Sequence, residues 1–429
     1  MYARILLWSC CFITTQSFAA GFYNDSQSVS AMGNAFAGAG AAGDDASMMF
    51  YNPATLTLIE DAQIVLAASY AIPDSTLTVT SAEDSFGHPI PNAAGQEYSA
   101  VPEQVIPAFY AAVPLNEQFV LGANITSPYF AQTEYPHDSV VNNTAIQNQF
   151  ITYTGNLSLA MQATKKLTLA AGANLQYFSA KINANIFREN GNNVFFNEYE
   201  GHDLAFYPNF GLLYEFTENT RLGLNYRMQV KQTTSGDFSI SGAGDHSVPA
   251  TSTIYFPDMV SLNLFHMLNE RIELLADVTF THWDLLQNIT VTTNEAPTDD
   301  ASNTPINAEV AFINTWRVGL GANYYLTPEI KLRSGAAFDQ SPVQDETRTL
   351  QGPDSNRVEV ALGMMYKPKA WEKTHLDFAY MHTFFADGTV NQVNPLYALF
   401  PDSEFNGITA SGYYNTSADF LGVQLVRII

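Results

Sequence analysis

The sequence predicts an all-β protein, a 14-stranded antiparallel transmembrane β-barrel with an N-terminal hatch plugging the lumen. Three observations support this prediction. Apolar residues recur at every second position in successive segments after residue 60. The spacers between these segments alternate between short and long. The first 19 residues have the character of a secretory signal.

Composition excludes several other classes of protein. Charged residues are 14% of the 429 residues, against about 25% in an average soluble domain, and aromatic residues are 13%. A hydrophobic content of 46% can build a large core, which excludes a disordered chain. The net charge of −24 would repel phosphates, so nucleic acid is not an expected partner. No apolar run approaches the roughly 20 residues that a spanning helix needs, which excludes an α-helical membrane protein.

Residues 1–19 are expected to be a signal peptide that is removed. Arg4 precedes an apolar run at residues 5–13, and the segment ends with Ser17-Phe18-Ala19, which has small residues at the two positions that a signal peptidase reads. Both cysteines of the chain, Cys10 and Cys11, lie in this segment. The mature chain is therefore expected to have no disulfide, thiolate metal site or cysteine nucleophile, as suits an exported barrel.

The barrel is predicted over residues 61–429. Apolar side chains occupy alternate positions, and the positions between them are small or polar, as at Asn174, Gln176, Asn225, Arg227 and Asp377. Because both the first and the last spacers are long loops, both chain ends should lie on the periplasmic side. The fourteen expected strands lie near 62–72, 103–114, 118–129, 148–163, 166–182, 203–216, 220–232, 257–268, 271–289, 312–326, 329–340, 356–367, 374–385 and 416–428.

Residues 20–60 do not alternate and are predicted to form the hatch. They contain a stretch rich in glycine and alanine at 31–43, followed by Asp44-Asp45, and they are too few for a separate soluble domain. Residues 38–43 match the dinucleotide fingerprint G-x-G-x-x-G, but a signal peptide lies upstream and a barrel follows in place of a βαβ unit. Tight packing of small residues against the barrel wall is the better interpretation, and no cofactor is expected.

The sequence does not indicate an enzyme. Its eight histidines are scattered without a metal-binding spacing, and there is no G-x-S-x-G motif. We therefore expect no catalytic residue and no metal ligand. A lipase-like Ser/His site and a calcium ion in a loop are the alternatives that this pattern leaves.

Two short motifs contain proline. Asn52-Pro53-Ala54 precedes the first strand, where Asn can cap a helix and Pro fixes φ. Ser127-Pro128-Tyr129 falls in the third strand, where Pro removes a donor of the strand ladder. A closed barrel has no edge strand, so Pro128 marks either a local break in the wall, with a side opening, or the outer end of the strand.

Taken in order, these motifs resemble the outer-membrane long-chain fatty acid transporter family (FadL/TodX-like). The resemblance runs from about residue 20 to the end of the chain. It is carried by Ala20-Gly21-Phe22, Gly33, Ala35, Gly38, Gly40, Asp44-Asp45, Asn52-Pro53-Ala54, Thr126-Ser127-Pro128-Tyr129, Thr133-Glu134-Tyr135, Pro257, Val260-Ser261-Leu262, Trp283, Arg333-Ser334-Gly335, Asp339-Gln340-Ser341-Pro342-Val343, Pro353-Asp354 and Arg357.

The resemblance implies passive outer-membrane transport of a hydrophobic compound, with long-chain fatty acids as the expected ligand. The ligand would enter near the external loops, occupy an inner pocket beside the N-terminus, and leave sideways into the lipid at a kinked third strand. Lateral exit keeps an alkyl chain in apolar surroundings, and each buried CH₂ is worth about 0.8 kcal/mol. Outer-membrane lipid is thus a partner, and one chain can act as a monomer.

The resemblance also assigns roles to individual residues. Phe22 would be a pocket wall, Asn52-Pro53-Ala54 would anchor the hatch, and Pro128-Tyr129 would mark the wall gap. Phe130 stands where the family usually has Gly, which would narrow the opening or gate it differently. A carboxylate ligand needs a cation. The candidates are Lys181 and Arg188, at the outer end of the fifth strand, which could equally be ordinary loop charges.

Other functions fit parts of the pattern. Uptake of aromatic or alkane hydrocarbons shares the fold and needs no cation near the pocket. A general porin would have a polar, open lumen and no hatch. A surface adhesin or barrel enzyme would function without the hatch or would need a specific Ser/His pair.

Overall fold

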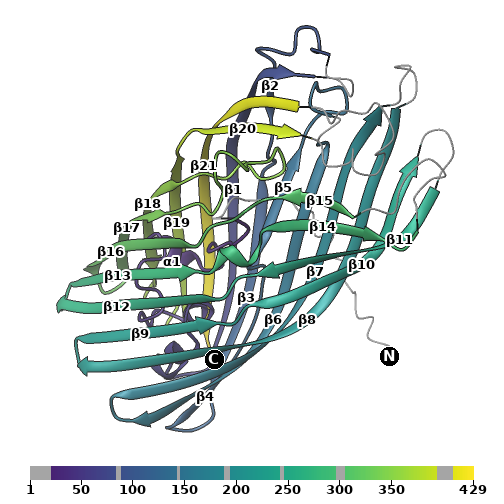
Figure 1. Cartoon of the computed structure of the whole chain (residues 1–429). Helices are drawn as coiled ribbons and strands as arrows, with labels where there is room; N and C mark the ends of the chain where they lie inside the picture. The colour runs from purple at the N-terminus through teal and green to yellow at the C-terminus, as the bar shows by residue number, and fades with distance from the viewer. Residues whose placement is uncertain are drawn as a thin grey trace, which may run out of the picture.

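The computed structural model describes residues 21–83, 88–142, 145–187, 194–241, 246–295, 305–393 and 409–429. The predicted signal peptide lies outside these residues. The described chain forms a closed antiparallel β-barrel of 14 strands (Figure 1). The barrel closes where the first strand pairs with the last, beginning with Gln63 opposite Ile428. The predicted fold class and strand number are confirmed.

Eight strands of the barrel are continuous and six are interrupted. The continuous strands are β1 (Gln63–Ala82), β3 (Gln104–Pro114), β6 (Gln147–Thr164), β7 (Leu167–Phe187), β8 (Val194–Thr217), β17 (Ile330–Asp339), β18 (Arg357–Tyr366) and β21 (Thr409–Ile428). The interrupted strands are β4 (Phe119–Thr126) with β5 (Phe130–Glu134), β9 (Thr220–Arg227) with β10 (Val230–Ser241), β11 (His246–Phe256) with β12 (Met259–Asn269), β13 (Ile272–Thr281) with β14 (Asn288–Thr293), β15 (Ile306–Glu309) with β16 (Thr315–Thr327), and β19 (Thr374–Phe385) with β20 (Gly388–Val393). The short β2 (Glu97–Ser99) adds to the outer part of β1, and η3 (Trp283–Leu285) lies between β13 and β14.

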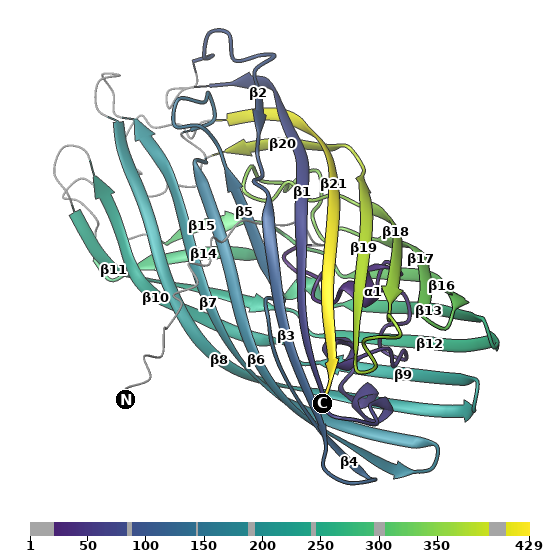
Figure 2. The ribbon, with the colours of Figure 1, turned by 180° about the vertical axis from the view of Figure 1, so that it is seen from behind.

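The expected and observed strands agree at one end of the barrel and differ at the other. We call the end with the short turns and the chain terminus Ile429 the lower end; it faces the lower left of Figure 1 and the lower right of Figure 2. At the upper end, strands continue into the spacers predicted as loops, and β10 and β11 occupy most of 233–256. These extensions are rich in Ser and Thr, so they lack the apolar alternation that identified the lower halves, yet their backbones pair in full register.

Side chains along the strands point alternately into the lumen and out from the barrel, as predicted. On β7, Leu175 is 52% exposed on the outer face, whereas Asn174 and Gln176 are buried in the lumen. The same alternation places a broad belt of Leu, Val, Phe and Tyr side chains on the outer surface. An outward apolar belt around a polar interior is typical of an outer-membrane barrel. No helix within the described residues is long and apolar enough to cross a membrane.

Residues 21–60, which we call the N-terminal segment, lie inside the lower half of the barrel (Figures 1 and 2). The segment contains α1 (Val29–Met32), η1 (Ala46–Phe50) and η2 (Pro53–Leu58). Ser28, Asp45 and Asn52 each cap one of these short helices with a side-chain oxygen. Since the side chains of all three helices are largely buried, the segment replaces water in this part of the lumen.

The segment touches the wall at wall glycines. A Cβ atom at Gly335 would lie 2.0 Å from the carbonyl oxygen of Asn34, and one at Gly223 would lie 2.0 Å from that of Gly40. No side chain fits at such distances. The glycine-rich run therefore packs against positions of the wall that are themselves glycine.

Candidate functional site

The third strand of the barrel is broken at residues 127–129. β4 pairs with β3 on one side and β6 on the other, but β5 pairs with β6 alone. The pairing of β3 with β4 ends at Phe109 opposite Ile125. Along this edge, residues 104–108 of β3 therefore pair with no described strand. Pro128 has no N–H to offer, which suits it to such a break. Of the two interpretations of Pro128, the geometry matches a break in the wall.

The beginning of the N-terminal segment lies against this break. Tyr23 and Tyr129 form an isolated antiparallel bridge. The Asn24 N–H donates to the Pro128 carbonyl at 2.8 Å, and the Phe130 N–H donates to the Phe22 carbonyl at 2.7 Å. These are the bonds that a neighbouring strand would supply. The segment thus acts as a short replacement strand at the broken position.

The side chain of Gln27 strengthens this junction. Its Nε2 donates to the Ser127 carbonyl at 2.8 Å, and its Oε1 accepts from the Ser127 N–H at 3.0 Å. Gln27 therefore satisfies both backbone groups of a residue that the strand ladder has released. Sequence reasoning missed Gln27, because a single buried glutamine carries no signal of its own.

A cavity of about 100 Å³ lies inside the barrel above the N-terminal segment. Its wall is mainly apolar, with contributions from Phe22, Phe150, Phe238 and Phe312. The polar side chains that line it are amides and hydroxyls, among them Asn148. None of the described residues that line it is charged. The cavity therefore suits the apolar part of a ligand.

The structure places Phe22 in the wall of this cavity, at its lower side. The Phe22 ring centroid lies 5.5 Å from that of Phe150, 5.9 Å from Trp283 and 5.6 Å from Phe312. The next residue, Tyr23, bridges Tyr129 at the break in the wall. Two successive residues therefore connect the cavity to the interrupted strand.

Asn52, Pro53 and Ala54 join the N-terminal segment to the wall. The Asn52 Nδ2 donates to the Gly40 carbonyl at 2.7 Å and to the Leu212 carbonyl of β8 at 3.1 Å. Its Oδ1 accepts from the Ala54 N–H at 3.0 Å, which caps η2. Pro53 is the first residue of that helix, where its missing N–H costs nothing. One side chain thus holds two parts of the segment and one strand together.

Of the two basic residues predicted near the pocket, Lys181 is described by the structure and does not line the cavity. Ile182 lines the cavity, so the adjacent Lys181 projects from the opposite face of β7. Its Nζ lies 2.9 Å from Glu198 and 3.8 Å from Glu200. Arg188 lies outside the described residues.

Ion pairs between the segment and the wall are a feature that the sequence did not reveal. Asp44 pairs with Lys331 and Arg333 of β17. Burial opposes ionisation of Asp44, but these two cations outweigh it and hold its pKa well below the ordinary value. Farther up the lumen, wall residues also pair with one another: the Arg317 guanidinium lies 3.1 Å from both Asp277 and Glu359. Charged residues at inward positions were visible in the sequence, but their partners lie tens to hundreds of residues away.

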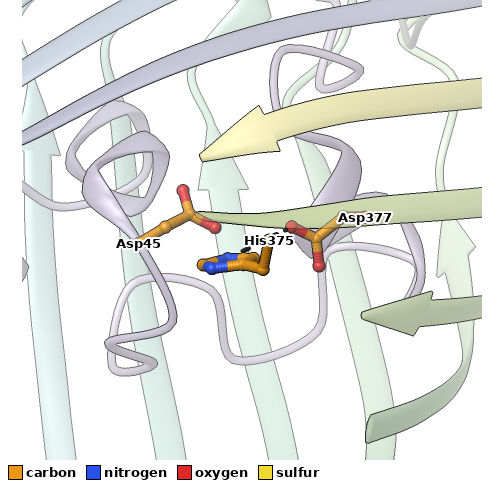
Figure 3. A group of neighbouring side chains, drawn as sticks. All are labelled: Asp45, His375 and Asp377. Atoms are coloured by element: carbon orange, nitrogen blue, oxygen red, sulfur yellow. Dashed lines mark ion pairs between the residues drawn. The ribbon is translucent and has the colours of Figure 1, made fainter. Parts of the chain in front are cut away.

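Asp45, His375 and Asp377 form a buried cluster where the segment meets β19 (Figure 3). Asp45 already accepts from the Ser47 N–H at 2.8 Å, the Ser30 hydroxyl at 2.7 Å and the Gln424 amide at 2.9 Å. Asp377 accepts from Arg333 at 2.6 Å, and His375 Nε2 lies 3.5 Å from its other oxygen. Both carboxylate oxygens of Asp45 thus accept hydrogen bonds from protein groups. The cluster therefore connects the N-terminal segment to the wall of the barrel.

The sequence is similar to known outer-membrane proteins. Residues 10–426 match the family described as outer membrane protein transport protein (OMPP1/FadL/TodX). The chain is 25% identical over 415 residues to the long-chain fatty acid transport protein of Escherichia coli K12, covering 86% of this chain and 89% of that protein. It is 27% identical over 406 residues to outer membrane protein P1 of Haemophilus influenzae, covering 85% and 86%.

Solved structures agree on the fold. A crystal structure of a Pseudomonas aeruginosa FadL homologue matches with a TM-score of 0.85 at 20% identity, covering 95% of this chain and 100% of that one. The match to the family extends over nearly the whole sequence, including the segment, the broken strand and the closing strand β21. The chain belongs to the OMPP1/FadL/TodX family and is an outer-membrane transport protein.

Proposed function

We propose that this protein carries long-chain fatty acids across the outer membrane by passive diffusion, through the apolar cavity and out sideways at the broken third strand. The observation that carries the proposal is the adjacency of the two features: Phe22 lines the cavity, and Tyr23 closes the break. A ligand that displaced these two residues would pass from an apolar pocket directly to lipid. The choice of fatty acid is supported by the Escherichia coli relative, a long-chain fatty acid transport protein.

In this proposal residues 20–60 are a hatch that keeps the lumen closed to water, and residues 61–429 are the barrel. The packing of the segment against wall glycines and its ion pairs with β17 support the role of a plug. Because one chain encloses the cavity, the plug and the opening, we propose that it acts as a monomer. Outer-membrane lipid receives the ligand.

Uptake of labelled oleate tests the proposal. Cells lacking their own fatty acid transporter are compared with and without this protein, after its insertion in the outer membrane has been verified. We expect the protein to restore uptake. If cells with a correctly inserted barrel take up no more oleate than cells without the protein, the proposal is wrong.

Neutral hydrocarbons are the second candidate ligand, and one observation favours them. The described lining of the cavity has no charged side chain, and Lys181 faces away from it. Toluene and hexadecane uptake should be measured in the same cells. A protein that transports these compounds and not oleate would be a hydrocarbon channel.

Replacing Phe130 by Gly should raise the flux of bulky ligands. Phe130 is the first residue of β5, is 2% exposed, and donates its N–H to Phe22. Gly keeps that backbone bond but removes the ring beside the opening. The lost burial costs several kcal/mol, about 3–5 for Phe→Ala in a core, so the amount of folded barrel must be measured alongside.

Phe130→Leu is the control, because it keeps most of the side-chain volume. We expect oleate uptake per folded barrel to rise several-fold in Phe130→Gly and to change little in Phe130→Leu. A fall in Phe130→Gly would mean that the ring supports the pathway.

A further inference from the structure

A second, smaller cavity lies below the first, between the N-terminal segment and the wall. Its volume is about 50 Å³. Tyr23 and Phe50 line it from the segment, and Arg227 and Ser261 line it from the wall. Trp283 also lines it and contacts Phe22, so one aromatic contact separates the two cavities. The space suits a small polar group and is too small for an alkyl chain.

Arg227 is a buried cation that forms no ion pair with any acidic residue of the described chain. It is 7% exposed and lies at the upper end of β9. Its Nη2 donates to the Phe50 carbonyl at 3.0 Å, and its guanidinium lies 4.6 Å from the Phe50 ring and 5.4 Å from the Tyr23 ring. Its Nη1 makes no hydrogen bond with any described residue. A buried donor that is left unpaired destabilises the fold, and a charged donor does so more strongly than a neutral one.

The carboxylates that line the same cavity have arginine partners of their own. Asp277 lies 3.1 Å from Arg317, Asp25 lies 3.6 Å from Arg317, and Asp339 pairs with Arg357. Within the described chain no carboxylate forms an ion pair with Arg227. The Asn225 Oδ1, which also belongs to a lining residue, is likewise unpaired.

The position of Arg227 relates the small cavity to the opening. Arg227 lies over the Tyr23 ring, and the Tyr23 ring is 5.6 Å from that of Tyr129 at the break. The upper cavity offers an apolar lining without a cation, and the lower one offers a cation with room for a head group. Together they provide separate places for the two ends of an amphiphilic acid.

We propose that Arg227 binds the carboxylate of an amphiphilic acid as the acid leaves the upper cavity, with the head group in the lower cavity and the tail at the broken strand. The fork of a guanidinium matches a carboxylate, and such charge-assisted bonds are about twice as strong as neutral ones. The proposal rests on the proposed function, since it assumes that the ligand reaches the upper cavity. It adds a basis for selecting acids over uncharged compounds of the same chain length.

Equilibrium binding to the purified barrel in detergent micelles tests this assignment. The two probes are oleate and oleyl alcohol, which share the tail and differ in the head group. We expect the wild-type protein to prefer oleate, and Arg227→Met to lose that preference by about tenfold while its affinity for oleyl alcohol stays unchanged. Arg227→Lys should keep part of the preference, because it keeps the charge without the fork.

Arg221→Met is the matched control. Arg221 lies on the same strand, donates to the Ala41 carbonyl at 3.1 Å and lies 4.0 Å from the Phe265 ring, but it does not line the cavity. Its loss should leave the preference for oleate intact. A shift of equal size in Arg221→Met would show that any lumen cation acts in the same way and would overturn the assignment to Arg227.

Asp25→Asn gives a test that does not touch Arg227. Asp25 lines the same cavity, and removing its charge should strengthen oleate binding without altering oleyl alcohol binding. Acetate at the same concentration should not displace oleate; if it does, the site holds a free small anion and the proposal fails. Equal binding of the two probes by the wild type overturns the inference alone. If the wild type binds neither probe, the proposed function fails with it.

Discussion

A disulfide between positions 23 and 129 is expected to stop transport. Tyr23 and Tyr129 are bridge partners, and the bonds flanking them run from Asn24 to Pro128 and from Phe130 to Phe22. This is the pattern of a non-hydrogen-bonded antiparallel pair, whose Cα atoms lie about 4.5 Å apart. Disulfides span Cα distances of about 4.4–6.8 Å, so Tyr23→Cys/Tyr129→Cys should cross-link without moving the backbone. The cross-link would hold the segment across the opening.

The expected result is oleate uptake at the level of cells without the protein, restored by a reductant. The two natural cysteines, Cys10 and Cys11, lie in the predicted signal peptide, so the introduced thiols should have no competitor. Each single cysteine variant controls for loss of a tyrosine ring. Undiminished uptake by a protein shown to be fully cross-linked would rule out exit at the broken strand.

The control pair is Ser75→Cys/Thr416→Cys. These residues face each other on β1 and β21, with their hydroxyl oxygens 3.0 Å apart, and they join two strands of the wall away from the broken strand. Their cross-link should leave uptake unchanged. A loss of uptake here would indicate that any disulfide disturbs assembly.

Replacing Asn52 by Ala should change uptake much more than it changes the barrel. The substitution removes the side-chain bonds to the Gly40 carbonyl, the Leu212 carbonyl and the Ala54 N–H. A lost cap and lost buried hydrogen bonds cost about 1–2 kcal/mol, which weakens the seating of the segment. The wall strands keep all of their own ladder bonds. We therefore expect altered ligand uptake and an increased ion leak through the lumen.

Ion conductance in planar bilayers and oleate uptake in cells measure the two effects, and heat-modified gel mobility measures folded barrel. Thr55→Ala is a nearby control, because among the described residues its hydroxyl donates to the Asn52 carbonyl alone, within the segment. Normal uptake and conductance in Asn52→Ala, with normal folding, would mean that the anchor is redundant with the ion pairs of Asp44.

The barrel was predictable because lipid outside and polar contacts inside impose a period of two on each lower strand. Leu175 and Gln176 show how sharp that signal is. The upper strands were not predictable in this way. The outward faces of β10 and β11 are polar, as at Lys231 and Thr233, so the apolar alternation is weak in the sequence although Phe238 and Val248 face inward. The pairing of these strands depends on backbone bonds, which composition does not record.

The site was predictable only where a local motif carries the constraint. Pro128 signals a break because it lacks a donor, and Asn52 signals a cap because of the Pro that follows it. Lys181 was predicted to bind a carboxylate ligand, but its partners are Glu198 and Glu200 on the next strand. The register between β7 and β8 brings these residues together, and the sequence does not reveal that register. Arg227 was visible as an inward polar residue. Its lack of a partner became visible only with the neighbours in place.

The wall glycines make the lower lumen an imprint of the backbone that fills it. The carbonyl oxygens of Asn34 and Gly40 occupy the space that a Cβ atom would take at Gly335 and Gly223, so the backbone of residues 34–40 lies directly on the wall. Residues 22–24 are held differently, by two backbone hydrogen bonds at the break and by the packing of the Phe22 and Tyr23 rings. In the proposed mechanism, one continuous stretch therefore combines a fixed plug with a short removable end, so that a hydrophobic ligand leaves through the wall while the lower lumen stays filled.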